Sequence, residues 1–158
     1  MMSEIALSPN EVRRIVSYCS EEVRRQQDGP LHVGYMVDAW MNAIEHQYRG
    51  LGIDLVTIEN WGRLVAPDDN SMGFRDGDVY IGGRFAVRVS EMHEQMDRWM
   101  AMLTDMTALE AYKEFEFTHP FFDGNGRTGK IILNYINGSL LDPIFPPADL
   151  FGYPITNP

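Results

Sequence analysis

The chain has 158 residues, of which 44% are hydrophobic and 23% charged, and its formal net charge is −10. This length and composition favour one soluble globular domain with a single hydrophobic core. The acidic balance argues against nucleic acid or an anionic membrane as the main partner, and no apolar run approaches the length that crosses a bilayer.

Cysteine usage and the N-terminus bear on the compartment. The only cysteine is Cys19, so an intramolecular disulfide is excluded, and a reducing compartment fits the chain. We expect Cys19 to be a small buried side chain on a helix. The N-terminus lacks the apolar core of a signal peptide. The expected location is the cytoplasm, or delivery into a host cell without a cleaved signal.

The first predicted helix has a clear start and a clear stop. Residues 8–11, Ser-Pro-Asn-Glu, carry the capping-box residues with proline at the first helical position. Apolar residues then recur at helical spacing until Asp28, Gly29 and Pro30 end the run. Residues 1–29 are therefore predicted to form an N-terminal helical segment, separate from a core over residues 30–141.

Helical spacing continues through most of the core. The predicted helices cover about 31–49, a short stretch from Ile58 to Val65, a methionine-rich stripe from Val89 to Leu103, a stretch opened by the capping-box residues Thr107 and Glu110, and a last helix that begins near Gly126. Prolines then recur through a predicted C-terminal tail, residues 142–158, at Pro143, Pro146, Pro147, Pro154 and Pro158.

One stretch departs from the helical pattern. Residues 74–83 combine a turn-forming Asp76-Gly77 with the β-favouring run Val79-Tyr80-Ile81. This indicates a small β-hairpin, and the predicted fold class is mainly α, a compact helical bundle with such a hairpin. An exposed hairpin edge could bind an extended peptide by strand addition, although a surface turn without a role fits these residues equally well.

Residues 119–130, His-Pro-Phe-Phe-Asp-Gly-Asn-Gly-Arg-Thr-Gly-Lys, are the most informative segment. His119 can move a proton, and Asp123 can hold a hard cation such as Mg²⁺. A glycine-rich turn at the start of a helix favours anion binding, and Arg127 and Lys130 add positive charge. The segment is typical of a nucleotide-handling active site.

Two common phosphate motifs and a calcium loop fit parts of the sequence but fail on context. The glycine spacing from Gly124 resembles both a dinucleotide-binding turn and a P-loop. The P-loop needs Ser or Thr at the position of Ile131, and both motifs need a parallel sheet downstream, where only 28 residues remain. In the loop that begins at Asp68, Met72 cannot ligate calcium, and Val79 occupies the position of the closing glutamate.

With these residues in view, the chain resembles the Fic (filamentation induced by cAMP) family. The family signature HxFx(D/E)GNGRxxR is matched up to its last arginine, which is Lys130 here, and the resemblance extends over roughly residues 31–141. Tyr112 replaces a histidine that is common seven residues before the motif histidine. Doc (death on curing) toxins are a more distant match.

The resemblance implies a helical fold with a β-hairpin flap and transfer of AMP from ATP to a Ser, Thr or Tyr hydroxyl of a target protein. His119 would be the general base, and Asp123 would hold Mg²⁺. The phosphates of ATP would bind the residues from Gly124 through Lys130 that match the motif, and the target would lie on the flap. The implied binding residues are Gly124, Asn125, Gly126, Arg127 and Lys130 for the nucleotide, and Val79, Tyr80, Ile81 and Gly82 for the target.

Regulation and reaction type stay open at this level. The family's inhibitory motif, [ST]xxxE[GN], is matched by Ser17 and Glu21 but not by Glu22, so Glu21 is a candidate inhibitor and a solvated helix face is the alternative. A separate small antitoxin-like partner could also restrain the protein. Lys130 could bind the γ-phosphate weakly or extend into solvent. The alternative functions are a Doc-like kinase, which usually has lysine in place of Gly126, and a non-enzymatic nucleotide-binding module.

Overall fold

α-Helices build most of the fold. The computed structural model describes residues 5–150. Its elements, in chain order, are α1 (Pro9–Arg25), α2 (Leu31–Tyr48), α3 (Leu55–Val65), β1 (Tyr80–Ile81), β2 (Arg84–Phe85), α4 (Val89–Met102), the 3₁₀ turn η1 (Leu103–Asp105), α5 (Ala108–Thr118) and α6 (Asn125–Asn137). The predicted fold class is confirmed, because the described residues are mainly helical and the sheet has only two short strands.

Both predicted capping boxes are present. Ser8 accepts a hydrogen bond from the Glu11 N–H while the Glu11 carboxylate accepts one from the Ser8 N–H, and Thr107 and Glu110 repeat this arrangement at α5. Each box satisfies donors that the first turn of a helix leaves unpaired. These local bonds fix where α1 and α5 begin.

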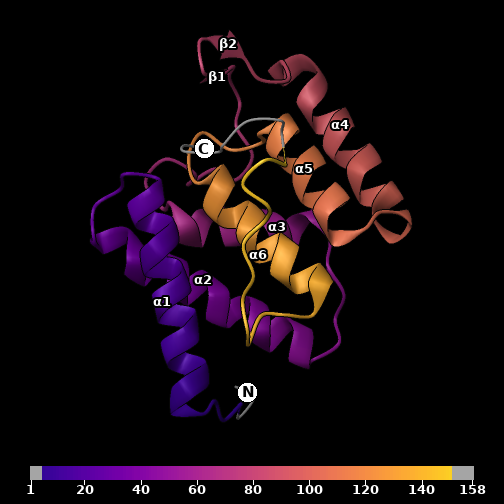
Figure 1. Ribbon diagram of the computed structural model, residues 1–158. Helices are drawn as coiled ribbons and strands as arrows, with labels where there is room; N and C mark the ends of the chain where they lie inside the picture. The colour runs from indigo at the N-terminus through magenta and orange to yellow at the C-terminus, as the bar shows by residue number, and fades with distance from the viewer. Residues whose placement is uncertain (1–4, 151–158) are drawn as a thin grey trace.

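α2 and α6 form the centre of the molecule. α6 packs against α2, α3 and α5, and Figure 1 shows it between α5 and the α2–α3 pair. α1 covers α2 on one side, while α4 packs on α5 on the other. The core between these helices is apolar and includes the fully buried side chains Met36, Trp40, Ile58, Trp61, Met92, Met96, Phe115 and Phe121. The predicted methionine stripe is therefore part of the core, as is Cys19.

The hairpin lies further along the chain than the sequence predicted. Tyr80 pairs with Phe85 and Ile81 with Arg84, so the second strand falls outside the predicted range 74–83. The turn is Gly82-Gly83, where both residues have positive φ (55° and 83°), and not Asp76-Gly77. Two consecutive residues with positive φ suit the tight turn of a two-residue hairpin, and glycine adopts them without strain.

The chain beyond α6 packs back onto the helices. The Trp40 indole donates to the Leu140 carbonyl (2.8 Å), Tyr18 donates its hydroxyl to the Ile144 carbonyl (2.7 Å), and the Tyr18 ring stacks on Phe145. The predicted positions Pro154 and Pro158, like residues 1–4, lie outside the described residues. Within residues 5–150, no helix has both the length and the apolar character that a membrane span requires.

Candidate active site

The motif begins at the end of α5 and continues into α6. His119 ends α5 in the left-handed region (φ 53°), and Gly124 precedes α6 with φ 72°. A left-handed conformation is uncommon for a residue other than glycine and persists only where the surroundings hold it. The two left-handed residues turn the chain so that the loop between them lies at the N-terminus of α6.

The His119 imidazole is buried and stays neutral at physiological pH. Burial lowers its pKa from the ordinary value to about 4; the Arg75 charge lowers it further, while a hydrogen bond to the backbone of Glu116 and the nearby Asp123 carboxylate oppose the shift. A neutral imidazole can accept a proton, as a general base must. The structure thus puts the predicted base in the protonation state that the role requires.

Two asparagines hold the loop in shape. The Asn125 amide donates to the Phe121 carbonyl and accepts from the Phe121 N–H (both 2.9 Å). Asn70, in the loop after α3, donates to the Asp123 carbonyl (2.7 Å) and accepts from the Asp123 N–H (3.3 Å). The Asn125 side chain therefore fixes the loop, and what it offers to a phosphate is its backbone N–H. The part predicted for its side chain in nucleotide binding stays a prediction.

The N-terminus of α6 is suited to an anion. Gly124 makes no side-chain cap, and the first N–H to bond within the helix is that of Thr128. The N–H groups of Asn125, Gly126 and Arg127 therefore lie at the positive end of the helix dipole without an intrahelical acceptor. This arrangement fits the predicted phosphate site.

Arg127 is almost fully buried, 1% exposed, and binds acidic groups on two loops. Its Nη2 lies 3.3 Å from Asp123 Oδ2 and 3.2 Å from Asp28 Oδ2, a residue between α1 and α2. Its Nη1 donates to His32 Nδ1 (3.0 Å) and to the Val65 carbonyl (3.3 Å). The guanidinium predicted to hold phosphates is thus engaged by protein groups, two of which come from the N-terminal part of the chain.

Lys130 does not extend into solvent. It is 3% exposed, its Nζ lies 3.0 Å from Glu22 Oε2, and it sits over the Tyr112 ring. The same Glu22 oxygen accepts a hydrogen bond from Gln26 (2.5 Å). Gln26 in turn covers Gly126, where an added Cβ would lie 2.7 Å from its Nε2.

We call Glu22, Gln26 and Asp28 the α1 end. All three lie on or just beyond the last turn of α1, and they contact three motif positions, Lys130, Gly126 and Arg127. The end of the N-terminal helix therefore lies against the predicted nucleotide site.

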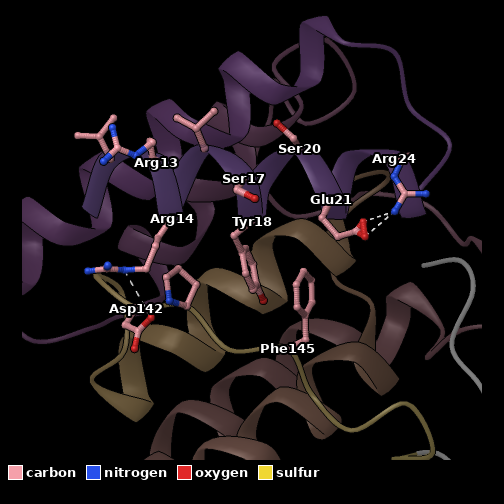
Figure 2. Close-up of a pocket in the computed structure, with 12 residues that line it drawn as sticks. Arg13, Arg14, Ser17, Tyr18, Ser20, Glu21, Arg24, Asp142 and Phe145 are labelled. Carbon is pink, nitrogen blue, oxygen red and sulfur yellow. Dashed lines mark hydrogen bonds and ion pairs between the residues drawn. The ribbon is translucent and has the colours of Figure 1, made fainter. Parts of the chain in front are cut away.

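Glu21, the predicted inhibitory residue, is not among these contacts. Its carboxylate pairs with Arg24 on the outer surface of α1, where Figure 2 shows it facing a surface pocket. Glu22, the next residue, faces inward and is fully buried. The structure thus puts Glu22 where the sequence placed Glu21, because the inward face of α1 includes Ile15, Cys19, Glu22 and Val23.

Several buried polar atoms around α6 lack a partner among the described residues. They are Glu22 Oε1 and Gln26 Oε1 on the α1 side, Tyr112 OH and Glu116 Oε1 on α5, and Arg127 Nε and Thr128 Oγ1 on α6. Burying a polar atom without a hydrogen bond is costly, so such groups indicate a place where water or a polar ligand binds. These atoms lie on three elements that meet at the motif.

The flap presents an aromatic pair beside the motif. Tyr80 and Phe85 are exposed and lie with ring centroids 4.2 Å apart, and Arg88 sits over Phe85. The structure shows the predicted flap residues Val79, Tyr80, Ile81 and Gly82 on or next to this hairpin, with the Val79 carbonyl accepting from the Ala86 N–H (2.9 Å). Their role in target binding stays a prediction.

Motif reasoning missed five residues that the structure brings to the site: Glu22, Asp28, His32, Asn70 and Arg75. For Glu22, the helical spacing of the sequence already indicates a buried position. Glu22 lies seven residues after Ile15, at the helical spacing of the buried face of α1, and a charge on such a face usually has a partner. The others are distant in sequence from the motif; the family resemblance includes Arg75 but gives it no role in the site.

A model of the Fic/DOC family matches residues 53–136. The matched segment begins just before α3, includes the flap and the whole His119–Lys130 motif, and ends near the end of α6. α1 and the whole of α2 precede it.

Proposed function

Because the chain belongs to the Fic/DOC family, we propose that it is a transferase that moves AMP from ATP to a hydroxyl group of a target protein. The observation that carries the proposal is the pairing of a neutral, buried His119 with the uncapped N-terminus of α6 on one short loop. One group can accept a proton, and the other can stabilise phosphate oxygens.

In the proposed step, side-chain and backbone groups of this chain accept the proton and stabilise the phosphate charge. His119 takes the proton of the target hydroxyl as its oxygen bonds to the α-phosphorus. The bond from that phosphorus to the bridging oxygen of the β-phosphate breaks, and pyrophosphate leaves with the electron pair. The α6 N–H groups stabilise the negative charge on the phosphate oxygens. Gly126 supports AMP transfer over γ-phosphate transfer, since Doc-like toxins usually have lysine there.

Asp123 fits a magnesium ion. Its side chain is one-third exposed, and its carboxylate oxygens are hard ligands. No cluster of three or more metal-binding side chains occurs in the part of the chain that the structure describes. Magnesium commonly binds one or two carboxylates together with substrate phosphates, so a single carboxylate suffices. When bound, Mg²⁺ supplies positive charge that offsets the phosphates.

We further propose that the α1 end restrains nucleotide binding. Among the described residues, Glu22 forms the one ion pair of Lys130, and the buried Glu116 is a second acidic group whose electrostatics involve Lys130. Asp28 shares Arg127 with Asp123. A phosphate of ATP carries the charge that could replace Glu22 on Lys130. This proposal transfers the inhibitory role predicted for Glu21 to its neighbour.

Labelled ATP tests the reaction type. The protein is incubated with cell lysate and ATP labelled at either the α- or the γ-phosphate, with His119→Ala as the matched control. We expect protein-bound label only from the α position, and none with the variant. Label retained only from the γ position would instead establish a kinase, and no transfer from either position would favour a binding module.

A further inference from the structure

Arg75 is a buried cation outside the motif. It lies between α3 and the flap and is 0% exposed. Arginine is almost never fully buried without partners, because removing its charge from water is costly. In the described part of the chain, the hydrogen bonds of its guanidinium all go to backbone carbonyls, and no carboxylate lies within ion-pair distance of it.

The carbonyls belong to two separate places. Arg75 Nε donates to the His119 carbonyl (2.7 Å), and Nη2 donates to the Thr118 carbonyl (3.2 Å). Nη1 donates to the Gly77 carbonyl (2.9 Å), and Nη2 also donates to the Val87 carbonyl. Gly77 precedes β1 and Val87 follows β2, so one guanidinium joins both ends of the flap to the turn that carries the base.

The backbone of Arg75 adds a fifth hydrogen bond. Its N–H donates to the Pro120 carbonyl (2.9 Å), the residue after His119. The carbonyls of three consecutive residues, 118–120, are thus held by this one residue. His119 is left-handed, a conformation that costs free energy and needs external support, and these bonds supply it.

We propose that Arg75 is a positioning residue that fixes His119 relative to the flap, so that a hydroxyl on a flap-bound target meets the imidazole. This inference rests on the proposed function. Proton transfer requires hydrogen-bond distance between base and hydroxyl, and a displacement of about 1 Å can reduce a rate roughly 100-fold. A rigid link between the flap and the His119 turn prevents such a displacement.

Arginine suits this role for a geometric reason. Its planar group carries five N–H donors in a fixed fork, whereas lysine has three donors on one atom. A lysine at position 75 keeps the charge but cannot span the flap ends and the His119 turn together. Charge and geometry can therefore be tested separately.

Asp78 offers a matched control. Its Oδ1 accepts from the Val89 N–H (2.8 Å), and its Oδ2 pairs with Arg88 Nε (2.9 Å), so it also closes the base of the flap. Its charge interacts with that of Arg75 without an ion pair, and it has no contact with the His119 turn among the contacts of the described residues. Asp78→Ala loosens the flap alone, whereas Arg75→Lys loosens the flap and the base together.

Steady-state kinetics with the full chain and a labelled target test the link. We expect Asp78→Ala to raise KM for the target with kcat within about twofold, and Arg75→Lys to lower kcat by about tenfold or more while ATP affinity stays within about twofold. A folded Arg75→Lys protein with unchanged kcat would overturn the proposal. If Arg75→Lys does not fold, Arg75→Ala is assayed with added guanidinium, which should restore kcat; no recovery would also count against the proposal.

Two readouts do not depend on transfer activity. In Arg75→Lys, amide exchange should rise both in the flap and at residues 118–120, while in Asp78→Ala it should rise in the flap alone. Arg75→Met should raise the pKa of the His119 imidazole, measured by NMR, because a nearby positive charge is lost while Asp123 stays; Arg75→Lys should not. Unchanged exchange at 118–120 in a folded Arg75→Lys protein would refute the link even if the proposed reaction is wrong.

Discussion

His119 is kept neutral by its surroundings. Burial lowers the pKa of the imidazole to about 4, since the charged form is poorly solvated there. A neutral imidazole at physiological pH is available as a base without a prior deprotonation. The same burial shields it from bulk water, which could otherwise compete as a proton source.

The pH dependence of transfer follows from this pKa. Between about pH 8 and about pH 5 we expect no change in kcat from His119, because its pKa near 4 leaves it unprotonated throughout. Below that range kcat should fall as His119 gains a proton. The measurement is kcat at saturating ATP and target over the pH range. An acid limb centred between pH 6 and 7 that disappears in a His119 variant would contradict the assignment.

Glu22 and Glu21 are adjacent, but we expect their substitution to have different effects. Glu22→Gln removes the charge that occupies Lys130, so ATP should bind about tenfold tighter or more, which corresponds to one charge-assisted hydrogen bond. Without ATP the same variant should be less stable, by up to about 3–5 kcal/mol, because Lys130 stays buried without its partner.

The matched control is Glu21→Gln, whose exposed pair with Arg24 contributes little. It should leave both ATP affinity and stability nearly unchanged. Calorimetric titration with ATP and thermal unfolding check the pair of variants. Equal ATP affinity for wild type and Glu22→Gln would remove the restraining role of the α1 end.

α3 supports the motif through a close contact. The Phe121 ring lies directly over Gly62, where an added Cβ would meet ring atoms at 2.3 Å. Phe121 is fully buried, and its backbone is the partner of Asn125, so the ring and the loop are fixed together. The family motif thus depends on a glycine in a helix that the motif does not include.

Gly62→Ala and Gly34→Ala should change stability in opposite directions. Gly62→Ala should lower the free energy of unfolding by about 1–3 kcal/mol and reduce transfer, because the Phe121 ring must move. Gly34, in α2, has no atom within 4 Å of an added Cβ, so Gly34→Ala should raise it by about 0.5–1 kcal/mol. Urea unfolding measures both changes. A Gly62→Ala protein as stable as the wild type would contradict the close contact between Phe121 and Gly62.

The elements were predictable where local chemistry decides them. Capping boxes place the starts of α1 and α5, and apolar stripes indicate the buried faces of α4 and α6. The hairpin was misplaced because Asp76-Gly77 and Gly82-Gly83 are both turn-forming, and only strand pairing shows which one closes the hairpin. Glu22 was not predicted because the inhibitory motif has its glutamate at position 21, whereas the buried face of α1 includes Glu22.

The whole molecule joins residues that are far apart in sequence. The α1 end contacts Arg127 and Lys130 across roughly a hundred residues. The motif itself was recognisable from twelve residues. Its contacts with the α1 end were not, because the local sequence around Glu22 or Asp28 does not indicate partners so far along the chain. Tertiary packing of α1 on α2 brings them together.

A buried carboxyl makes overall stability depend on pH. Burial raises the pKa of Glu116 to about 7, helped by Glu22 and opposed by Lys130. The folded pKa of Glu116 exceeds the unfolded value of 4.5. The contribution of the protonated carboxyl to the free energy of unfolding is therefore fully present below about pH 4.5 and is lost as pH rises through 7. The loss amounts to roughly 3 kcal/mol.

Glu116→Gln should therefore remove that alkaline loss. Compared with wild type, the variant should gain stability as pH rises from about 5 to about 8. His119 acts in the other direction: its lowered pKa makes stability fall as pH drops from 6.5 toward 4, in both proteins. The free energy of unfolding across this range checks both. A difference between the two proteins that is constant with pH would contradict the assignment to Glu116.

The chemical identity of the group that the Glu22→Gln protein transfers decides whether the reaction is AMP transfer with His119 as the base. Unlabelled ATP, target and this variant are incubated, and the modified target peptide is analysed by mass spectrometry, with His119→Ala in the same background as control. We expect an AMP group on a Ser, Thr or Tyr hydroxyl that is absent with the His119 variant. A phosphoryl group in its place, or an AMP group that persists without His119, would contradict it.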